Sequence, residues 1–323
     1  MPGKGGIGTA VHTGRNVVAM ADSVKGSPVP SSHAGMCADQ LTFIAVCPQF
    51  WFHGLKRIIS ERQLMINVVD VSHHFGLRPV LSHINFRVAP GKSVTIMGAN
   101  GVGKTTLLSI IAGLIAPASG SVEIHGLRRR SSEEAELKIR QQVAFLPDHP
   151  WSPEFITTRE WLMAVGQLYD IESDHLLDHI SRLLDLFQLA DKGDSPIRTC
   201  SNGQKKKIAI CGTLVTEAPV LVLDEPFTGG LDPPAILALR RVLNHIAERG
   251  DTTVLMASQI PELVEQLAQQ ILVLSGTQVV AYDTLEGLRR QTGCAGSLPE
   301  VFEKLVHPET TEHIEKYFNR PRK

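Results

Sequence analysis

The alternation of apolar and polar positions changes character near residue 65. Gly, Ser, Pro and Ala dominate residues 1–35, and no helical or strand period persists there. From Met65 onward, apolar runs follow one another closely. We expect residues 1–64 to be a poorly ordered leader, which the mature protein would lack if translation began at Met65. The rest of the chain has the size of one compact domain.

Beyond residue 65, short apolar runs alternate with segments of helical period. The expected strands are 66–71, 83–88, 93–97, 143–146, 220–223, 253–257 and 270–274. The expected helices are 104–114, 203–216, 234–248 and 260–268. Strands that alternate with helices predict an α/β fold, in which helices cover both faces of a mainly parallel sheet.

A helical block over residues 157–190 interrupts this alternation. It opens with Thr157 and Glu160 at the spacing of a capping box, which satisfies the first free N–H groups of a helix. Leu176, Ile180 and Leu183 then recur at helical spacing and predict a buried face. We expect an inserted helical subdomain over about residues 150–200.

Composition narrows the functional class. Hydrophobic residues make up 43% of the chain and charged residues 20%, as in a typical globular protein. Lys and Arg number 32 against 33 Asp and Glu, so the basic excess typical of DNA-binding proteins is missing, and no nucleic-acid partner is expected. No run reaches the 18 or so apolar residues of a membrane span. Five cysteines without a C-x-x-C pair favour the reducing cytoplasm.

The strongest local signal is a glycine-rich turn between a predicted strand and a predicted helix. Its pattern is G-x-x-x-x-G-K-[ST], formed by Gly98, Ala99, Asn100, Gly101, Val102, Gly103, Lys104 and Thr105, with Thr106 following. Glycines let successive backbone N–H groups point inward at phosphates, and the helix N-terminus adds partial positive charge. Lys104 is expected to reach the β- and γ-phosphates, and the Thr105 hydroxyl to bind Mg²⁺. The predicted ligand is therefore a nucleotide.

A second element agrees with this interpretation. The all-apolar run 220–223, typical of a strand buried on both faces, ends in Asp224 and Glu225. A carboxylate at such a strand end lies beside the phosphate loop, so we expect Asp224 to hold Mg²⁺. Glu225 is expected to polarise the attacking water.

The segment Ser201-Asn202-Gly203-Gln204 resembles the L-S-G-G-Q signature of the ABC-family ATP-binding cassettes. The resemblance covers about residues 68–305 and implies a P-loop NTPase core with a small antiparallel β region and the inserted helical subdomain. It implies ATP and Mg²⁺ as cofactors and two cassettes, homo- or heterodimeric, paired head to tail. Each signature would then grip the γ-phosphate bound by its partner. Asn202 in place of Gly is a mild departure, because Asn tolerates left-handed backbone. The alternative is an ordinary polar turn, with Lys205, Lys206 and Lys207 on a solvated face.

The resemblance assigns roles to further residues. Phe75, in the loop after the first strand, matches the aromatic residue that stacks on adenine. Asp232 matches the loop that contacts the partner cassette. Residues 298–302 are similar to the closing helix of export-type cassettes, and residues 306–323 form a C-terminal tail.

Two positions depart from the family pattern. Asp148 stands where the family has a Gln that contacts Mg²⁺, and a carboxylate can still bind that metal. Gln259 stands where the family has a His that reaches the γ-phosphate. Glutamine can donate a hydrogen bond but carries no positive charge, which predicts slower hydrolysis than in fast family members. The alternative, that a neutral Gln suffices, stays open.

The function that follows from the resemblance is that of the ATPase subunit of a membrane transporter. A separate permease would supply the membrane spans and hold the cassette on the inner face of the cell membrane, and export is favoured over import. A regulatory or hydrolysis-impaired cassette is the alternative, supported by Asp148 and Gln259 and opposed by the intact Glu225. A soluble non-transport ABC protein is disfavoured, because the chain has one phosphate loop and no long heptad run.

Overall fold

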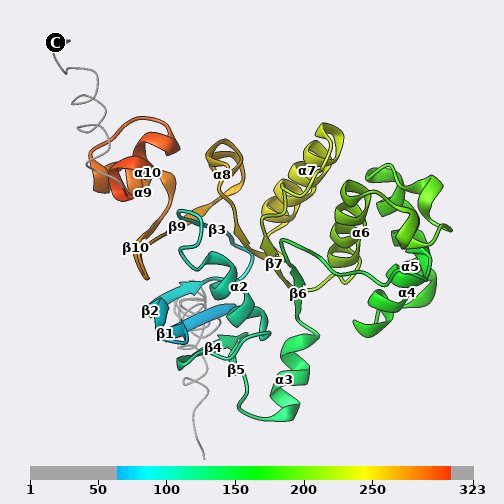
Figure 1. The fold of residues 1–323 in the computed structure, drawn as a ribbon, viewed down its shortest axis with the longest axis horizontal. Coiled ribbons are helices and arrows are strands. Elements are labelled where there is room, and N and C mark those ends of the chain that lie inside the picture. The colour runs from blue at the N-terminus through cyan, green and yellow to red at the C-terminus, as the bar shows by residue number, and fades with distance from the viewer. Residues whose placement is uncertain (1–63, 307–323) are drawn as a thin grey trace, which may run out of the picture. The chain divides into compact units, whose positions relative to one another are not determined.

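The computed structural model describes residues 64–306 of the 323. The expected leader and most of the expected C-terminal tail therefore lie outside the described residues. Two sheets organise the fold (Figure 1). The larger has the order β10-β9-β3-β8-β7-β6, and the smaller has the order β2-β1-β4-β5.

The six-stranded sheet is mainly parallel. Its strands are β3 (Ser93–Met97), β6 (Val143–Leu146), β7 (Val220–Asp224), β8 (Thr253–Ala257), β9 (Gln270–Ser275) and β10 (Gln278–Asp283). Only β10, at one edge, pairs antiparallel with its neighbour. The strands β3, β7 and β8 are buried at every position, as expected when both faces of a parallel sheet are covered.

The four-stranded sheet is antiparallel. Its strands are β1 (Ile66–Phe75), β2 (Arg78–Val88), β4 (Ser119–Ile124) and β5 (Leu127–Arg128). Phe75 is the last residue of β1, so its predicted position in a loop is corrected: pairing with Arg78 extends the hairpin to its tight turn. For the same reason, β2 begins five residues before the predicted strand.

Helices connect and cover the strands. They are α2 (Lys104–Ala112), α3 (Glu133–Arg140), α4 (Thr158–Leu168), α5 (Ser173–Leu186), α6 (Asn202–Leu214), α7 (Pro233–Arg249), α8 (Pro261–Leu267), α9 (Leu285–Thr292) and α10 (Leu298–Val306). The helix α3, capped by Ser132, lies in a polar segment for which the sequence predicted no helix. Within residues 64–306, no helix is long and apolar enough to cross a membrane.

Two apolar cores lie on opposite faces of the parallel sheet. Val220 and Val222 of β7 pack with the antiparallel sheet and α2, while Leu221 and Leu223 pack with α4, α5, α6 and α7. This two-residue alternation is the normal consequence of strand geometry. A third core joins α8, α9 and α10. The sheet therefore holds the C-terminal ends of β3 and β7 between packed layers, where the predicted phosphate loop and carboxylates lie.

Candidate nucleotide site

The loop between β3 and α2 requires glycine for two separate reasons. Gly101 and Gly103 have φ angles of 76° and 107°, in the left-handed region that other residues rarely adopt. A Cβ on Gly98 would lie 2.6 Å from the carbonyl oxygen of Leu274, and one on Gly103 would lie 2.9 Å from a methyl carbon of Val80. No side chain caps α2, which leaves its first N–H groups available to an anion.

Lys104 folds back over this loop. Its ammonium donates hydrogen bonds to the carbonyl oxygens of Gly98 (2.9 Å) and Ala99 (3.2 Å). Burial lowers the pKa of Lys104, and the nearby carboxylates of Glu225 and Asp224 oppose that shift. The loop therefore carries a positive charge within electrostatic reach of both acidic residues predicted for the site.

Asp224 ends β7 as a fully buried side chain. Neither carboxylate oxygen makes a hydrogen bond of normal geometry to another group among residues 64–306. Burial raises the pKa of Asp224, and contact with the Thr105 hydroxyl opposes the rise. A buried acid without a protein partner is unfavourable unless a cation balances it. Oxygen donors from Asp224 and Thr105 fit the preference of Mg²⁺ for hard oxygen ligands.

Glu225 follows directly in a strained backbone conformation, with φ at 44°. Its N–H donates to the carbonyl oxygen of Ala257 (3.1 Å), which ties the residue to the end of β8. One carboxylate oxygen, Oε2, is buried without a hydrogen-bond partner in the described part of the chain. Burial raises the pKa of Glu225, while the charge of Lys104 and the backbone N–H of Gln259 oppose the rise.

The backbone N–H of Gln259 contacts the Glu225 carboxylate, and the Gln259 side chain is exposed.

Asp148 lies two residues after β6, and its charge raises the pKa of both Asp224 and Glu225. The structure thus brings together the phosphate loop, Lys104, Asp224, Glu225 and Asp148. With the ammonium of Lys206, whose charge also acts on Asp224, the cluster has two amines and three carboxylates, which can bind a metal–phosphate complex and hold a water for attack.

Sequence reasoning missed two residues that fix Asp148. Thr228 donates its hydroxyl to Asp148 Oδ1 (3.2 Å), and Lys206 donates to the Asp148 carbonyl oxygen (2.8 Å). Lys206 and Lys207 are 2% and 5% exposed, so the alternative of a solvated lysine face is wrong. The only feature of the sequence that could have predicted a buried lysine here is the helical period. Three consecutive lysines cannot all face solvent on a helix that packs against other elements.

Ser201 and Gln204 form a reciprocal cap at the start of α6. The Ser201 hydroxyl accepts from the N–H of Gln204 (3.3 Å), and the Gln204 side-chain oxygen accepts from the N–H of Ser201 (2.9 Å). Ser201 and Asn202 are exposed. Among residues 64–306, no hydrogen bond or ion pair joins the segment 201–204 to the phosphate loop 98–106.

Asp232 is the N-cap of α7, where it accepts from the N–H of Ala235 (2.9 Å). Its other oxygen pairs with Lys207 of α6 at 2.6 Å, and this hydrogen bond lowers the pKa of Asp232. The α6 and α7 N-termini are thereby fixed to each other. Phe75 is 56% exposed at the tip of the β1–β2 hairpin, and its ring forms a T-shaped pair with the His73 ring.

Comparisons with known proteins identify the family. A family model described as ABC transporter matches residues 81–228. The daunorubicin resistance ATP-binding protein DrrA3 of Streptomyces coeruleorubidus is 31% identical over 71% of this chain and 71% of its own length. The Nod factor export ATP-binding protein I of Rhizobium etli is 30% identical over 79% of this chain and 82% of its own.

A solved structure described as the ATP binding subunit of an ABC transporter superposes with a TM-score of 0.70. It is 31% identical in sequence and covers 75% of this chain and 99% of its own. The two relatives, each at least 30% identical, agree with the family model. The solved structure agrees with the observed fold and with the predicted α/β class. The chain belongs to the ABC transporter family and is one of its ATP-binding, ATP-hydrolysing cassettes.

Proposed function

We propose that this cassette hydrolyses ATP at a composite site and that a separate membrane permease uses the resulting closure for transport. The phosphate loop of one chain and the signature segment 201–204 of a second cassette would enclose each nucleotide. The observation that carries the proposal is the buried pair Asp224 and Glu225 beside the ammonium of Lys104: both carboxylate oxygens of Asp224 and Oε2 of Glu225 lack a hydrogen bond of normal geometry within residues 64–306.

Each residue of the site has a distinct task in this proposal. The N–H groups of residues 98–106 bind the phosphates and Lys104 neutralises their charge. Thr105, Asp224 and Asp148 would hold Mg²⁺, a cation that would stabilise the negative charge of the β- and γ-phosphates. The Glu225 carboxylate orients a water for in-line attack and takes its proton. The exposed ring of Phe75 stacks on adenine.

The signature segment supports the dimeric arrangement. Ser201 and Asn202 are exposed at the N-terminus of α6. A helix N-terminus of this kind favours an anion. The phosphate loop of the same chain makes no hydrogen bond with it, so a second copy is the natural source of that anion. Asp232, beside α6, would lie at the same contact between cassettes.

An exposed apolar segment supports a permease partner. Trp151 and Phe155, each 80% exposed, lie between Asp148 and α4. A movement of the partner against this segment would displace Asp148. Lys206 and Thr228 hold that residue in the site. The cassette would then sit at the inner face of the membrane through its permease. The names of the two curated relatives, resistance and export, favour outward transport.

A hydrolysis-impaired cassette is the second candidate, because Gln259 cannot carry a proton to or from phosphate. One experiment separates the two. Mg²⁺-dependent ATP hydrolysis is measured for the protein and for Glu225→Gln, with Glu248→Gln, an exposed position on α7, as matched control. We expect Glu225→Gln to abolish turnover while ATP binding persists, and Glu248→Gln to leave turnover intact. Equal, background turnover in all three proteins, with ATP bound, would establish the impaired cassette instead.

A further inference from the structure

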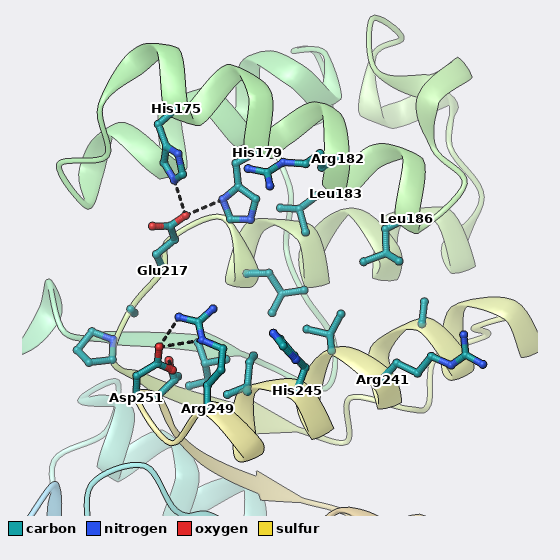
Figure 2. A pocket seen from close by; sticks show the side chains of 18 of the residues that line it. His175, His179, Arg182, Leu183, Leu186, Glu217, Arg241, His245, Arg249 and Asp251 are labelled. Atoms are coloured by element: carbon teal, nitrogen blue, oxygen red, sulfur yellow. Dashed lines mark hydrogen bonds and ion pairs between the residues drawn. The ribbon is translucent and has the colours of Figure 1, made fainter.

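A second chemically distinct cluster lies outside the nucleotide site. A cavity of about 1040 Å³ opens between α5, α7 and the turn from α6 to β7. Figure 2 shows His175 and His179 on α5 pointing towards Glu217, which lies in that turn. Arg182, His245 and Arg249 line other parts of the same cavity. None of these residues has a task in the proposed ATP mechanism.

The two histidines and the glutamate converge on one point. His175 and His179 are four positions apart on α5, so both rings lie on one helix face. Nε2 of His175 is 2.7 Å from Glu217 Oε1, and Nδ1 of His179 is 3.1 Å from the same oxygen. One donor atom from each residue lies within 4.8 Å of the other two.

Hydrogen bonds do not satisfy all the polar atoms of this cluster. Nδ1 of His179 is buried and makes no hydrogen bond of normal geometry within residues 64–306, although the Glu217 oxygen lies close to it. Two ring nitrogens also compete for a single carboxylate oxygen. Glu217 is held with φ at 49°, a conformation unusual for a residue other than glycine.

We propose that His175, His179 and Glu217 bind a transition-metal dication of the Zn²⁺ class. Imidazole nitrogen and carboxylate oxygen are a common zinc ligand set, and zinc takes four ligands in a tetrahedron. Bonds of about 2.0–2.1 Å require ligand separations of about 3.3 Å. The two nitrogen–oxygen distances to Glu217, 2.7 Å and 3.1 Å, are close to that value, and all three donor atoms lie within 4.8 Å of one another. The side chain of His175 is 48% exposed, so its ring can rotate to bring the nitrogen to the distance that a metal requires. The fourth position opens onto the cavity.

Such an ion would join α5 to the turn that leads into β7. Glu217 lies three residues before β7, and that strand ends at Asp224. The metal would therefore hold the helical layer to the strand that carries the proposed Mg²⁺ ligand. Because nitrogen ligands discriminate against Mg²⁺, the two metals would occupy their sites independently.

The test is Zn²⁺ binding by the full chain, measured by competition with a chromogenic chelator. Excess Mg²⁺ is present to occupy oxygen-rich sites, and nucleotide is absent. We expect one tight equivalent for the protein, and at least about tenfold weaker binding for His179→Gln and for Glu217→Gln. The matched control is His245→Gln, which changes a histidine of the same cavity outside the cluster and should leave the affinity unchanged.

Co²⁺ provides a second readout of the same site. Substituted for Zn²⁺, it should give the intense visible absorption of a tetrahedral ion in the protein and in His245→Gln, and lose it in His179→Gln. Thermal unfolding in chelator should be the same for all variants, which checks that they fold. Unchanged Zn²⁺ affinity in a His175→Gln, His179→Gln double variant would overturn the proposal, as would loss of affinity in His245→Gln alone.

Discussion

A Cβ atom on Gly203 would lie 2.4 Å from the carbonyl oxygen of Gly230, closer than real Cβ atoms approach another atom. The start of α6 therefore rests directly on the loop before α7. The Lys207–Asp232 ion pair fixes the same two segments a turn further along. The signature segment and the loop containing Asp232 thus form one unit, and the position of either depends on the other.

We predict that Gly203→Ala lowers the free energy of unfolding by about 1–3 kcal/mol, because the added methyl group must push two backbones apart. ATP hydrolysis should fall with it, since the segment 201–204 loses its position, while ATP binding to the phosphate loop persists. Chemical denaturation and nucleotide titration measure the two effects. Asn202→Ala, at the exposed neighbouring position, is the control for stability. Full stability in Gly203→Ala would contradict the close contact.

The charge of Asp148 predicts a pH effect. It raises the pKa of Glu225, and Glu225 must be ionised to accept a proton from water. Asp148→Asn removes the charge but keeps an oxygen for the Thr228 hydroxyl. The pKa of Glu225 should then fall, and the acid limb of the pH–rate profile should move to lower pH at saturating Mg²⁺. Asp194→Asn, at an exposed position, should leave the profile unchanged. A shift to higher pH in Asp148→Asn would refute the electrostatic argument.

Asp224 should destabilise the protein when neither metal nor nucleotide is bound. Its pKa is raised on folding, so the folded state binds a proton more readily than the unfolded state. Stability is therefore lost as pH rises from the ordinary pKa of aspartate through the raised value, and the full penalty persists at neutral pH. We predict that Asp224→Asn, in chelator at pH 7, increases the free energy of unfolding by on the order of 1 kcal/mol.

That gain should disappear at pH values below both pKa values, where Asp224 is protonated in either state. Denaturation curves for the two proteins at acidic and neutral pH provide the measurement. With Mg²⁺ and ATP present, the variant should instead be the less stabilised of the two, because it lacks the proposed metal ligand. A variant less stable than the parent in chelator at pH 7 would show that Asp224 has a stabilising partner in the unliganded protein.

The neutral side chain of Gln259 predicts a limit on the rate of ATP hydrolysis. Its side chain is exposed and free to face nucleotide, but it cannot carry positive charge. We predict that Gln259→His raises the maximal rate of ATP hydrolysis several-fold, measured at saturating Mg²⁺-ATP. Gln278→His, on the exposed start of β10, should have no effect. An unchanged rate in Gln259→His would mean that a neutral side chain suffices and that Lys104 and Glu225 carry the chemistry.

The sequence was most informative where local pattern and burial agree. Strands β3, β6 and β8 were predicted with their observed bounds, because each is a continuous apolar run between turn residues. Short or half-exposed elements such as β5 and α3 were missed, since their formation depends on neighbours rather than on an apolar period. Phe75 was assigned to a loop because nothing in its local pattern reveals the pairing with Arg78.

Some residues of the candidate site could likewise be predicted from local sequence, and others could not. The phosphate loop and the Asp224–Glu225 pair follow from local motifs in their strand and helix context. The contacts of Lys206 and Thr228 with Asp148 join residues 58 and 80 positions apart, so only the folded chain reveals them. The cluster of His175, His179 and Glu217 is likewise invisible in sequence, because Glu217 comes from a separate turn.

In the proposed mechanism, a second cassette completes each active site. Two inactive variants test it directly: Lys104→Ala removes the phosphate-binding ammonium, and Ser201→Arg blocks the signature segment. A head-to-tail pair of one chain of each kind contains one intact composite site, formed by the signature of the first and the phosphate loop of the second.

The measurement is Mg²⁺-ATP hydrolysis by each variant alone and by an equimolar mixture, at concentrations that allow pairing. We expect near-background rates for each variant alone. The mixture should recover about a quarter of the parent rate, because half of randomly formed dimers are mixed and each holds one intact site. If the mixture is as inactive as each variant alone, although the two variants still form dimers with each other, the composite site is contradicted.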